Sequence, residues 1–218
     1  MPKGLFITFE GTEGCGKSTQ VKLLAERLST LGHRVRTLRE PGGTPIGEEI
    51  RHTLKHSHAN TAMTAEAELL LMNASRAQLV REVIRPALAA GEIVVCDRFY
   101  DSTTAYQGHG RQLDLEKVKT VIEFAVGETK PNLTLLLHVP AETSAERLRS
   151  RQESLPFVRD RFEEADRKFF ERVAHGFGGI AAAEPQRVKV INGAQPLKTV
   201  CAAIWELVQP LLPQTGRW

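Results

Sequence analysis

The feature that most constrains how this chain folds is the glycine-rich stretch at residues 11–18, which reads GTEGCGKS. It matches the pattern G-x-x-x-x-G-K-[ST] at every fixed position. An apolar run at residues 5–9 precedes it, and Val21, Leu24 and Leu28 follow it at the spacing of one helix face. A strand, a glycine loop and a helix in this order form the setting in which the pattern binds a nucleoside triphosphate.

The residue types in this loop suit a complex of ATP with magnesium. Glycines let backbone N–H groups approach phosphates without a clash from Cβ. Lys17 is expected to reach the β- and γ-phosphates, and Ser18 to bind Mg²⁺ through its hydroxyl group. Glu13 is unusual here, because a carboxylate in an anion-binding loop repels phosphate. The residues of this segment that are expected to bind ATP are Gly11, Thr12, Glu13, Gly14, Cys15, Gly16, Lys17, Ser18 and Thr19.

The rest of the sequence alternates between expected strands and expected helices. Apolar runs at residues 92–96 and 133–139 are continuous, as in strands that are buried on both faces of a parallel sheet. Residues 34–38 and 187–191 alternate, as strands nearer an edge do. Helices are expected after the glycine loop and at Ala65–Leu79, Leu115–Val126, residues 163–173 and residues 197–212. This order predicts an α/β fold, a doubly wound five-stranded parallel sheet flanked by helices, in a single domain over residues 1–218.

Segments rich in polar residues and glycine follow four of the expected strands. In chain order they read EGTEGCGK, REPGG, DRFYD and NGAQ. Ligands of doubly wound sheets bind beyond the carboxyl ends of the strands, so these segments predict one composite site. Asp97, at the end of the third expected strand, is expected to support the metal together with Ser18. Residues 149–161 are polar, contain a proline and lack periodicity, which predicts a mobile loop.

Several arginines bear on which group accepts the phosphoryl group. A phosphate monoester is already ionised near neutral pH, since its second pKa is about 6, so it needs cations rather than a general base. The arginines near the expected site therefore favour a nucleotide acceptor over an alcohol. On the residues alone, Arg98 could instead pair with Asp97, and Arg76 and Arg147 could lie on solvated helix faces. The candidates are Arg39, Arg76, Arg98, Arg147, Arg151, Arg159 and Arg161.

The bulk composition argues against several classes of partner. The formal net charge of +3 is too small, with acids interleaved among the arginines, to indicate nucleic-acid binding. Cys15, Cys96 and Cys201 are odd in number and widely spaced, which fits neither a disulfide framework nor a metal pattern. No run approaches the roughly 18 apolar residues of a membrane span. We therefore expect a cytoplasmic protein that binds small-molecule nucleotides, without nucleic acid or membrane as a partner.

Taken in order, these segments resemble one family, the bacterial thymidylate kinases, over nearly the whole chain. FEGTEGCGKSTQ resembles the family's phosphate loop, REPGGTPIGEEIR its second-strand segment and LLLMNASRAQ its base-side helix. DRFYDSTTAYQGHGR resembles its DR and YQG segment, and RDRFE closes its lid. The resemblance implies a P-loop fold of the nucleoside monophosphate kinase type with a mobile lid at about residues 149–161. It also implies magnesium-dependent transfer of the ATP γ-phosphate to dTMP, giving dTDP for dTTP synthesis, by a homodimer.

The resemblance further implies a role for individual residues. Glu13 would face the 3′-hydroxyl of dTMP, while Arg39 and Arg98 would hold its phosphate. Arg76 would hydrogen-bond the thymine base, assisted by Thr103. The other residues implied are Pro41, Met72, Tyr106 and Gln107 for dTMP, and Asn192 and Ala194 near the adenine of ATP.

Three of these positions carry a more specific implication. Tyr106 would lie against the 2′ carbon of the sugar and leave no room for a ribose hydroxyl. Position 14 is glycine, so the phosphate loop has no arginine of its own, and a lid arginine, Arg151 or Arg159, would join Lys17 and Arg98 in catalysis. Met72 stands where the family commonly has a phenylalanine that stacks on thymine; a thioether can pack on a base instead.

Two alternatives remain open at this point. One is another nucleoside monophosphate kinase, acting on UMP or dUMP. The other is a phosphate-loop ATPase or switch protein that hydrolyses ATP without transferring the phosphoryl group to a nucleotide.

Overall fold

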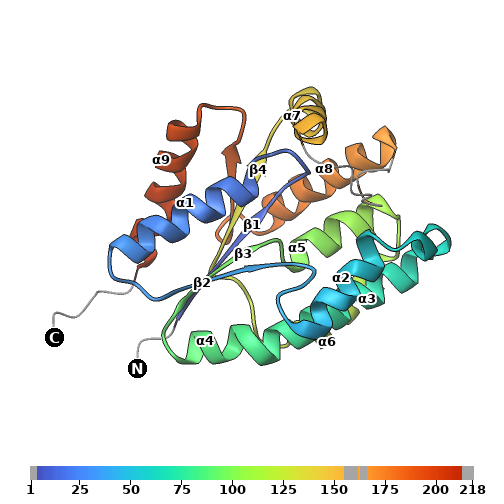
Figure 1. The fold of residues 1–218 in the computed structure, drawn as a ribbon, viewed down its shortest axis with the longest axis horizontal. Helices are drawn as coiled ribbons and strands as arrows, with labels where there is room; N and C mark the ends of the chain where they lie inside the picture. The colour runs from blue at the N-terminus through green and yellow to red at the C-terminus, as the bar shows by residue number, and fades with distance from the viewer. Residues whose placement is uncertain (1–3, 155–161, 163–165, 213–218) are drawn as a thin grey trace.

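In the part of the chain that the structure describes, residues 4–154, 162 and 166–212, five parallel strands form one sheet. Figure 1 shows this computed structural model, with the sheet between layers of helices. The strand order is β2-β3-β1-β4-β5. The strands are β1 (Leu5–Glu10), β2 (Val35–Arg39), β3 (Ile93–Asp97), β4 (Leu133–His138) and β5 (Val188–Asn192). The doubly wound parallel sheet expected from the sequence is confirmed.

Burial along the strands follows their hydrophobic patterns. Every residue of the central strand β1 is buried, whereas residues of the edge strand β2 are half-buried or exposed. The other edge strand, β5, has both buried and exposed positions. The distinction between central and edge strands is therefore confirmed, and no strand differs from its expected bounds by more than one residue at either end.

Helices cover both faces of the sheet. Helices α1 and α9 lie on one face, and α3, α4 and α6 lie on the other (Figure 1). The α-helices are α1 (Lys17–Thr30), α2 (Pro45–Lys55), α3 (Ala65–Leu79), α4 (Arg85–Ala89), α5 (Tyr100–Thr103), α6 (Leu115–Val126), α7 (Ala141–Ser154), α8 (Arg167–Ala183) and α9 (Leu197–Val208). Shorter turns are the 3₁₀ segments η1 (His58–Ala62) and η4 (Gln209–Leu211) and the π-helical segments η2 (Val80–Ile84) and η3 (Thr104–Gly110).

The core is divided by the alternation of side chains along the central strands. Successive side chains of a strand point to opposite faces, so β1 contributes to both layers. Ile7 and Phe9 pack with α1 and α9, while Phe6 packs with α3 and α6. A third cluster joins η3 to α8 and includes Tyr106 and Phe169. The strand ends at the C-terminal edge are thereby held rigidly from both sides.

Helix α8 differs from the expected helix at residues 163–173. It begins after Asp166, whose carboxylate accepts a hydrogen bond from the Phe169 N–H at 2.7 Å, and it continues to Ala183. The prediction ended too early because glycines, including Gly176, disfavour a helix on propensity. Here Gly176 permits close packing, since a Cβ at this position would lie 2.7 Å from the His109 ring.

The expected loop at residues 149–161 is wrong for its first part. Residues 149–154 belong to α7, because the Ala-, Glu- and Arg-rich sequence AETSAERLRS favours a helix that runs on past residue 148. Residues 155–161, and with them Arg159 and Arg161, lie outside the described residues. Arg151 lies on α7, but its side chain also lies outside the description.

The C-terminal helix is shorter than expected. Helix α9 ends at Val208, and the 3₁₀ turn η4, which contains Pro210, follows it within the expected range of residues 197–212. Proline removes a backbone donor and therefore ends a regular helix. Among the helices of the described ranges, none is both long enough and apolar enough to cross a bilayer.

Candidate active site

The glycine loop between β1 and α1 has the geometry of an anion-binding loop. Gly11 has φ 134° and lies so close to β4 that a Cβ would be 2.4 Å from the Leu137 carbonyl oxygen, so only glycine fits. Lys17 is buried, and its Nζ donates to the carbonyl oxygens of Gly11 at 3.0 Å and Thr12 at 2.8 Å. The first turn of α1 has no side-chain cap. Its N–H groups and Lys17 can therefore serve phosphate oxygens.

The two residues expected to hold the metal lie side by side. Ser18 is the second residue of α1 and Asp97 ends β3, and the Ser18 hydroxyl donates to Asp97 Oδ2 at 2.7 Å. The parallel pairing of β1 with β3 brings them together, since Phe9 lies opposite Asp97. A hydroxyl and a carboxylate are oxygen ligands of the kind Mg²⁺ prefers when phosphates and waters complete its shell. The arrangement fits this ion.

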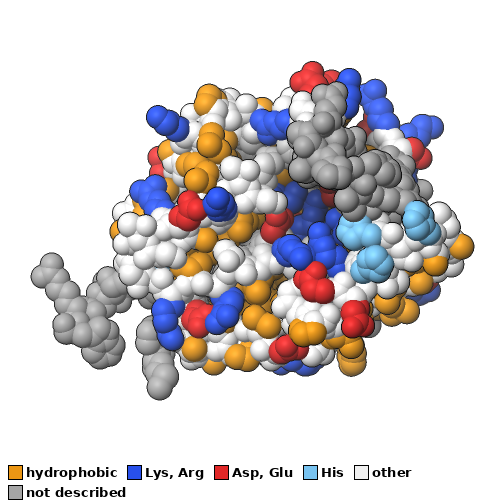
Figure 2. Space-filling view, viewed as in Figure 1, with side chains coloured by type: hydrophobic (Ala, Val, Ile, Leu, Met, Phe, Trp, Pro, Cys, Tyr) orange, Lys and Arg blue, Asp and Glu red, His pale blue; other side chains and the backbone are white. Residues whose placement is uncertain are grey.

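A pocket opens next to the loop. Figure 2 shows Lys and Arg side chains gathered in a hollow of the surface. The residues that line the pocket are Glu13, Glu40, Pro41, Lys55, Met72, Arg76, Arg98, Phe99, Ser102, Thr103, Tyr106, Gln107 and Phe162. This set contains all the residues expected to bind dTMP except Arg39. We call it the acceptor pocket.

Arg39 lies beside the acceptor pocket rather than in its lining. Its Nη2 donates to Glu48 Oε2 at 2.9 Å, and its side chain is half-exposed. Glu48 also accepts a hydrogen bond from the Gly43 N–H at 2.7 Å, and its carboxylate pKa is lowered because these bonds outweigh its desolvation. Arg39 is thus held over the turn that follows β2.

The carboxylate of Glu13 faces the acceptor pocket and is neutralised by Arg98. Arg98 Nη2 donates to Glu13 Oε1 at 2.7 Å, and the Tyr106 hydroxyl donates to Glu13 Oε2. Burial alone would raise the pKa of Glu13, but the charges of Arg98 and Lys17 outweigh it, and the pKa is lowered. Glu13 is therefore ionised, and the loop's acid does not stand alone.

Arg98 has an unusual backbone as well as a central position. Its φ of 71° lies in the left-handed region, which side chains other than glycine rarely occupy. Its Nη1 donates to the Gly11 carbonyl and to Ser102 Oγ, both at 3.0 Å. Such backbone strain concentrates at functional sites. The structure excludes the reading in which Arg98 merely pairs with Asp97, since its guanidinium donates to the glycine loop, to Ser102 on α5 and to Tyr106 on η3.

Arg76 is a pocket residue and not a surface residue of α3. Its side chain is 2% exposed, and Nε donates to Glu40 Oε2 at 2.8 Å. Nη1 bonds to Asn73 Oδ1 at 2.9 Å. Burial raises the pKa of Glu40, and the charge of Arg76 opposes that effect. Within the described ranges, Glu40 Oε1 and Thr103 Oγ1 are buried without a hydrogen-bond partner, which leaves two polar atoms for a bound molecule.

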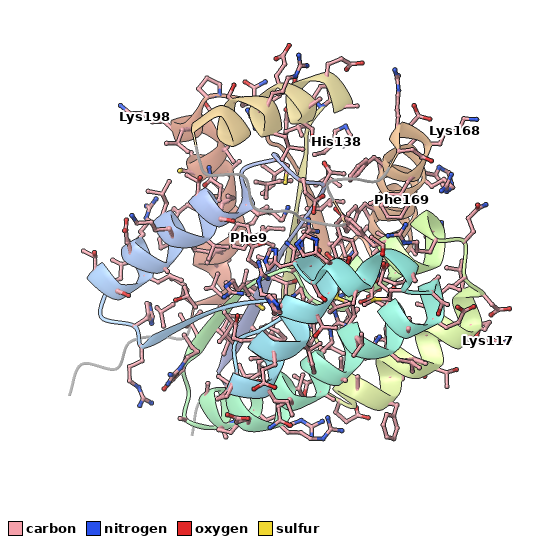
Figure 3. All side chains as sticks on the ribbon, turned by 45° about the vertical axis from the view of Figure 1, so that its right-hand side comes forward. Phe9, Lys117, His138, Lys168, Phe169 and Lys198 are labelled. Carbon is pink, nitrogen blue, oxygen red and sulfur yellow. The ribbon has the colours of Figure 1, made fainter. Side chains whose placement is uncertain are left out.

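The π-helical segment η3 places consecutive residues on the pocket wall. Tyr106 and Gln107 both line the pocket, as do the consecutive residues Ser102 and Thr103 of α5 just before this segment. The Tyr106 ring packs edge-on against Phe162 and Phe169, and Figure 3 labels Phe169 on α8. Gln107 Nε2 donates to the buried carboxylate of Glu68 at 2.8 Å.

The segment after β5 lies against the glycine loop. Asn192 Oδ1 accepts from the Ala194 N–H at 3.0 Å, and a Cβ at Gly193 would lie 3.1 Å from the Cys15 carbonyl oxygen. Arg147, on α7, donates to the Gly193 carbonyl at 3.2 Å. Gly193, between Asn192 and Ala194, therefore neighbours the loop, and Arg147 links α7 to this segment.

Several pocket residues were not found from the sequence. Glu40, Lys55, Ser102 and Phe162 all line the pocket, and the buried Glu10 stands behind it. Glu40 and Ser102 lie within segments that the sequence singled out, so their position was a usable signal. Lys55 ends α2 four residues beyond the segment REPGGTPIGEEIR, and its place in the pocket lining depends on how α2 packs against α3.

Comparisons with known proteins point to one family. The family model described as Thymidylate kinase matches residues 9–204. A thymidylate kinase of Syntrophotalea carbinolica is 49% identical over 201 residues, which cover 92% of this chain and 93% of that protein. A thymidylate kinase of Geobacter sulfurreducens is 45% identical over 212 residues, covering 97% and 99%.

A solved structure is also similar. The crystal structure of thymidylate kinase from Ehrlichia chaffeensis superimposes with a TM-score of 0.76 at 32% identity, over 95% of this chain and 99% of that one. The region matched by the family model contains the glycine loop, the acceptor pocket and the segment after β5.

Proposed function

This chain belongs to the thymidylate kinase family, and we propose that the site described above transfers the γ-phosphoryl group of ATP to dTMP, giving dTDP and ADP. The position of Glu13 is the observation that supports the division of the site into an ATP side and a dTMP side. Glu13 belongs to the ATP-binding loop, yet its carboxylate lines the acceptor pocket. One loop thus forms the boundary between the donor and the acceptor.

On the donor side, the loop from Gly11 to Thr19 would hold the triphosphate through backbone N–H groups, Cys15 and Gly16 included. Lys17 would exchange its two carbonyl partners for phosphate oxygens. Asn192 and Ala194 would lie near the adenine. Mg²⁺, held by Ser18 and Asp97, would neutralise charge on the β- and γ-phosphates.

On the acceptor side, Arg98 and Arg39 would hold the phosphate of dTMP. Arg76 and the buried hydroxyl of Thr103 would hydrogen-bond the base, with Gln107 beside them. Thymine offers two carbonyl oxygens and one N–H group, so it can pair with a guanidinium and with a hydroxyl. The acceptor phosphate is already ionised, so the site needs cations to bring two anions together rather than a general base.

The remaining contacts complete the acceptor site. Pro41 and Met72 would pack on the two sides of the base, and Tyr106 would lie against the sugar next to Glu13. Of the lid arginines, Arg151 or Arg159 would supply the last positive charge to the transferred group, as the resemblance of residues 149–161 to the family's lid implies. This division assigns a task to Arg76 and Arg98 among the charged side chains of the pocket.

Two properties of the whole molecule belong to the same proposal. We propose a cytoplasmic homodimer. Leu70 on α3 is 59% exposed and Phe124 on α6 is 83% exposed, and these helices pack against each other. Exposed apolar side chains on adjoining helices suit an interface between copies. Sedimentation of the wild type and of Phe124→Lys tests this: a dimer that dissociates in the variant supports it, and a monomeric wild type contradicts it.

The function is tested by a panel of nucleoside monophosphates with ATP and magnesium. We expect ADP release to depend on the acceptor, with dTMP the best substrate and UMP and dUMP far poorer. Equal ADP release with and without dTMP would instead identify an ATPase or switch protein. A preference for UMP or dUMP would move the assignment to another nucleoside monophosphate kinase, and Met72 is the first residue to substitute in that case.

A further inference from the structure

Behind the acceptor pocket, a buried carboxylate of β1 is connected to Arg98 through a single hydroxyl group. We propose that Glu10 and Ser102 form a hydrogen-bond relay that positions the Arg98 guanidinium for the acceptor's phosphate. Glu10 is a positioning residue, since it is fully buried and has no access to the substrate, and Ser102, which lines the pocket, passes its effect to Arg98. The inference rests on the proposed role of Arg98 as a phosphate-binding residue.

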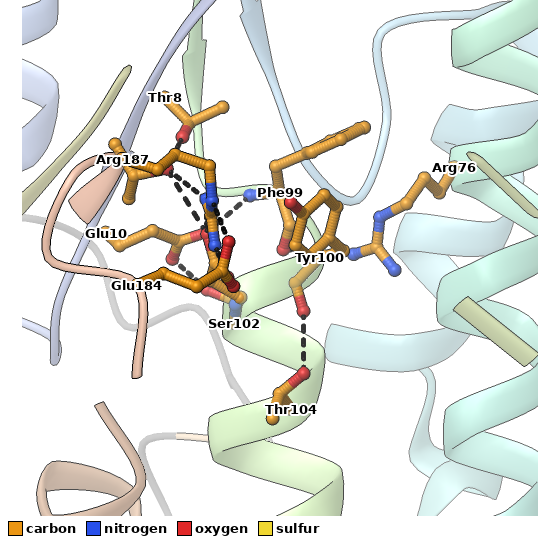
Figure 4. A network of polar contacts seen from close by, with 11 residues as sticks. Thr8, Glu10, Arg76, Phe99, Tyr100, Ser102, Thr104, Glu184 and Arg187 are labelled. Carbon is orange, nitrogen blue, oxygen red and sulfur yellow. Dashed lines mark hydrogen bonds and ion pairs between the residues drawn. The ribbon is translucent and has the colours of Figure 1, made fainter. Parts of the chain in front are cut away.

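The first step is the set of bonds that Glu10 makes. Its side chain is fully buried at the end of β1, immediately before Gly11. Oε1 accepts hydrogen bonds from the N–H groups of Phe99 at 2.8 Å and Ser102 at 3.2 Å, and Oε2 accepts from Ser102 Oγ at 2.5 Å. Figure 4 shows Glu10, Phe99 and Ser102 converging. The carboxylate therefore ties β1 to the residues that follow Arg98.

The second step is the direction of the hydrogen bonds at Ser102. A hydroxyl group has one proton, and a guanidinium can only donate. Since Arg98 Nη1 lies 3.0 Å from Ser102 Oγ, the oxygen must accept from Arg98 and give its own proton to Glu10. An ionised Glu10 enforces this orientation, because it can only accept. The charge of Glu10 is thus transmitted to the orientation of Arg98 without direct contact.

The third step is the backbone of Arg98. Its φ of 71° is unfavourable and persists only where the surroundings fix the chain on both sides. The Arg98 N–H bonds to the Phe9 carbonyl at 2.9 Å, and the next N–H, that of Phe99, bonds to Glu10. Two consecutive residues of β1 therefore clamp two consecutive residues after β3. Loss of the Glu10 carboxylate removes one half of this clamp.

The surroundings of Glu10 place its ionisation close to neutral pH. Burial, and then the charge of Asp101, raise the pKa of Glu10 to about 7, while Arg98 and the hydrogen bonds from Ser102 and Phe99 lower it. Asp101 forms an ion pair with Arg187, whose two terminal nitrogens lie 2.7 and 2.8 Å from the two carboxylate oxygens. Arg98 is then the cation that ionised Glu10 faces through Ser102.

The test uses steady-state kinetics on the full-length enzyme, with dTMP and ATP varied separately. In Glu10→Gln an amide N–H₂ can face Ser102 Oγ and reverse its hydroxyl, and Ser102→Ala removes the relay. We expect each substitution to raise the KM for dTMP by about tenfold, the value of one hydrogen bond to a charged group, and the KM for ATP by less than about twofold. The double variant should be no worse than the poorer single variant, because both changes break one chain.

Thr129→Val is the matched control, since it removes a buried hydroxyl group that accepts a hydrogen bond from an arginine elsewhere in the fold. Arg85 Nε donates to Thr129 Oγ1 at 2.9 Å. The substitution should lower the melting temperature without raising the KM for dTMP. If Thr129→Val raises this KM as much as Glu10→Gln does, the effect is general loosening of the fold and the relay is refuted.

Two further measurements separate the possible failures. Arg98→Gln must raise the KM for dTMP; if it does not, the proposed role of Arg98 fails rather than the relay. If Arg98→Gln raises the KM for dTMP while Ser102→Ala leaves it unchanged, the proposed relay is wrong. The titration of the dTMP phosphate is common to all variants, so only the wild type should lose an additional share of dTMP affinity as pH falls through about 7. Identical pH profiles for the wild type and Glu10→Gln contradict the proposal.

Discussion

Arg98 donates from Nη2 to Glu13 Oε1 at 2.7 Å, and this bond joins the glycine loop to the end of β3 across 85 residues of sequence. It explains how a loop that binds phosphates tolerates a carboxylate. The acid is directed to the acceptor pocket, where Arg98 and Tyr106 share it. Removal of either partner of a buried ion pair leaves the other charge uncompensated, so the pair acts as one unit.

Glu13→Gln should weaken the binding of the acceptor, dTMP, more than that of the donor, ATP. The amide cannot neutralise Arg98 and accepts a hydroxyl bond more weakly than a carboxylate does. We expect the KM for dTMP to rise by about tenfold or more and the KM for ATP by less than about twofold. Initial-rate kinetics measure both, with the exposed Glu26→Gln on α1 as the control. A defect confined to ATP would contradict the assignment of Glu13.

Lys17→Met should abolish phosphoryl transfer and leave dTMP binding intact. Lys17 contacts only the glycine loop in the hydrogen bonds found among the described residues, and it lies outside the lining of the acceptor pocket. We expect kcat to fall by on the order of a hundredfold or more. Calorimetric titration with dTMP should be unchanged. Lys22→Met, an exposed lysine on the same helix, should behave like the wild type, and normal turnover in Lys17→Met would refute the role.

Tyr106 should control the preference for deoxyribose. Its ring is held beside Glu13 by the phenylalanines of α8 and by the hydroxyl bond to Glu13. Tyr106→Ala should raise the kcat/KM ratio of ribothymidine monophosphate to dTMP by about tenfold or more, and Tyr106→Phe by less. If neither substitution changes this ratio, the sugar does not lie against Tyr106.

Lys55→Met should weaken the binding of dTMP because it removes a positive charge, and not because it removes packing. The described lining of the acceptor pocket carries three cations, Lys55, Arg76 and Arg98, against the two carboxylates of Glu13 and Glu40. The substitution makes the lining neutral and keeps the length of the side chain. We expect the dissociation constant of dTMP to rise by about fivefold, as for roughly 1 kcal/mol of Coulomb energy.

Thymidine, which lacks the phosphate, separates this charge effect from lost packing. Its dissociation constant should be the same for the wild type and Lys55→Met. Lys198→Met provides the control, since Lys198 points outward on α9 in Figure 3. Equal losses for dTMP and thymidine would show that Lys55 contributes packing and not charge.

Glu10 should make the stability of the protein fall as pH rises towards neutrality. Its pKa is raised from the ordinary 4.5 to about 7, so between these values the folded state binds a proton that the unfolded state has lost. Stability from this group is complete below about 4.5 and lost above about 7. Compared with Glu10→Gln, the wild type should lose on the order of 3 kcal/mol between about pH 4 and pH 8.

Thermal melts of both proteins over this range measure the difference. The melting temperature of the wild type should decline relative to that of Glu10→Gln by several degrees, whichever protein is the more stable at low pH. If the melting temperatures of the two proteins change with pH in the same way, Glu10 titrates in the folded state as it does in the unfolded chain.

The strands and the motif-bearing segments were predictable because their signals are local. The continuous apolar runs mark β1, β3 and β4, and the helix at Ala65–Leu79 was placed to the residue, as its N-cap Thr64 and its helix formers favour. The extent of α8 was not predictable, because the glycines in it weaken the local preference. Packing of Gly176 against His109 overrides that preference, and the sequence does not show which residues will meet.

The features of the candidate site also fall into those that the sequence could predict and those that it could not. The phosphate loop was predictable, since glycine spacing and a following helix suffice to bind phosphate. The pairing of Arg76 with Glu40 and the π-helical segment that carries Tyr106 and Gln107 were not, since each depends on contacts between distant segments. Lys55 illustrates the limit, because nothing in its neighbourhood in the sequence separates it from a solvated lysine.

The sequence by itself determined the parallel sheet, the phosphate loop and the family, because burial patterns and glycine positions act over a few residues. Only the tertiary structure decided where the charges point. The β1–β3 pairing brings Arg98 to Glu13 and Ser18 to Asp97, and the same contact buries Glu10 beneath Ser102. Electrostatic partners are chosen by distance and by burial, and both become defined only when segments far apart in the chain are packed together.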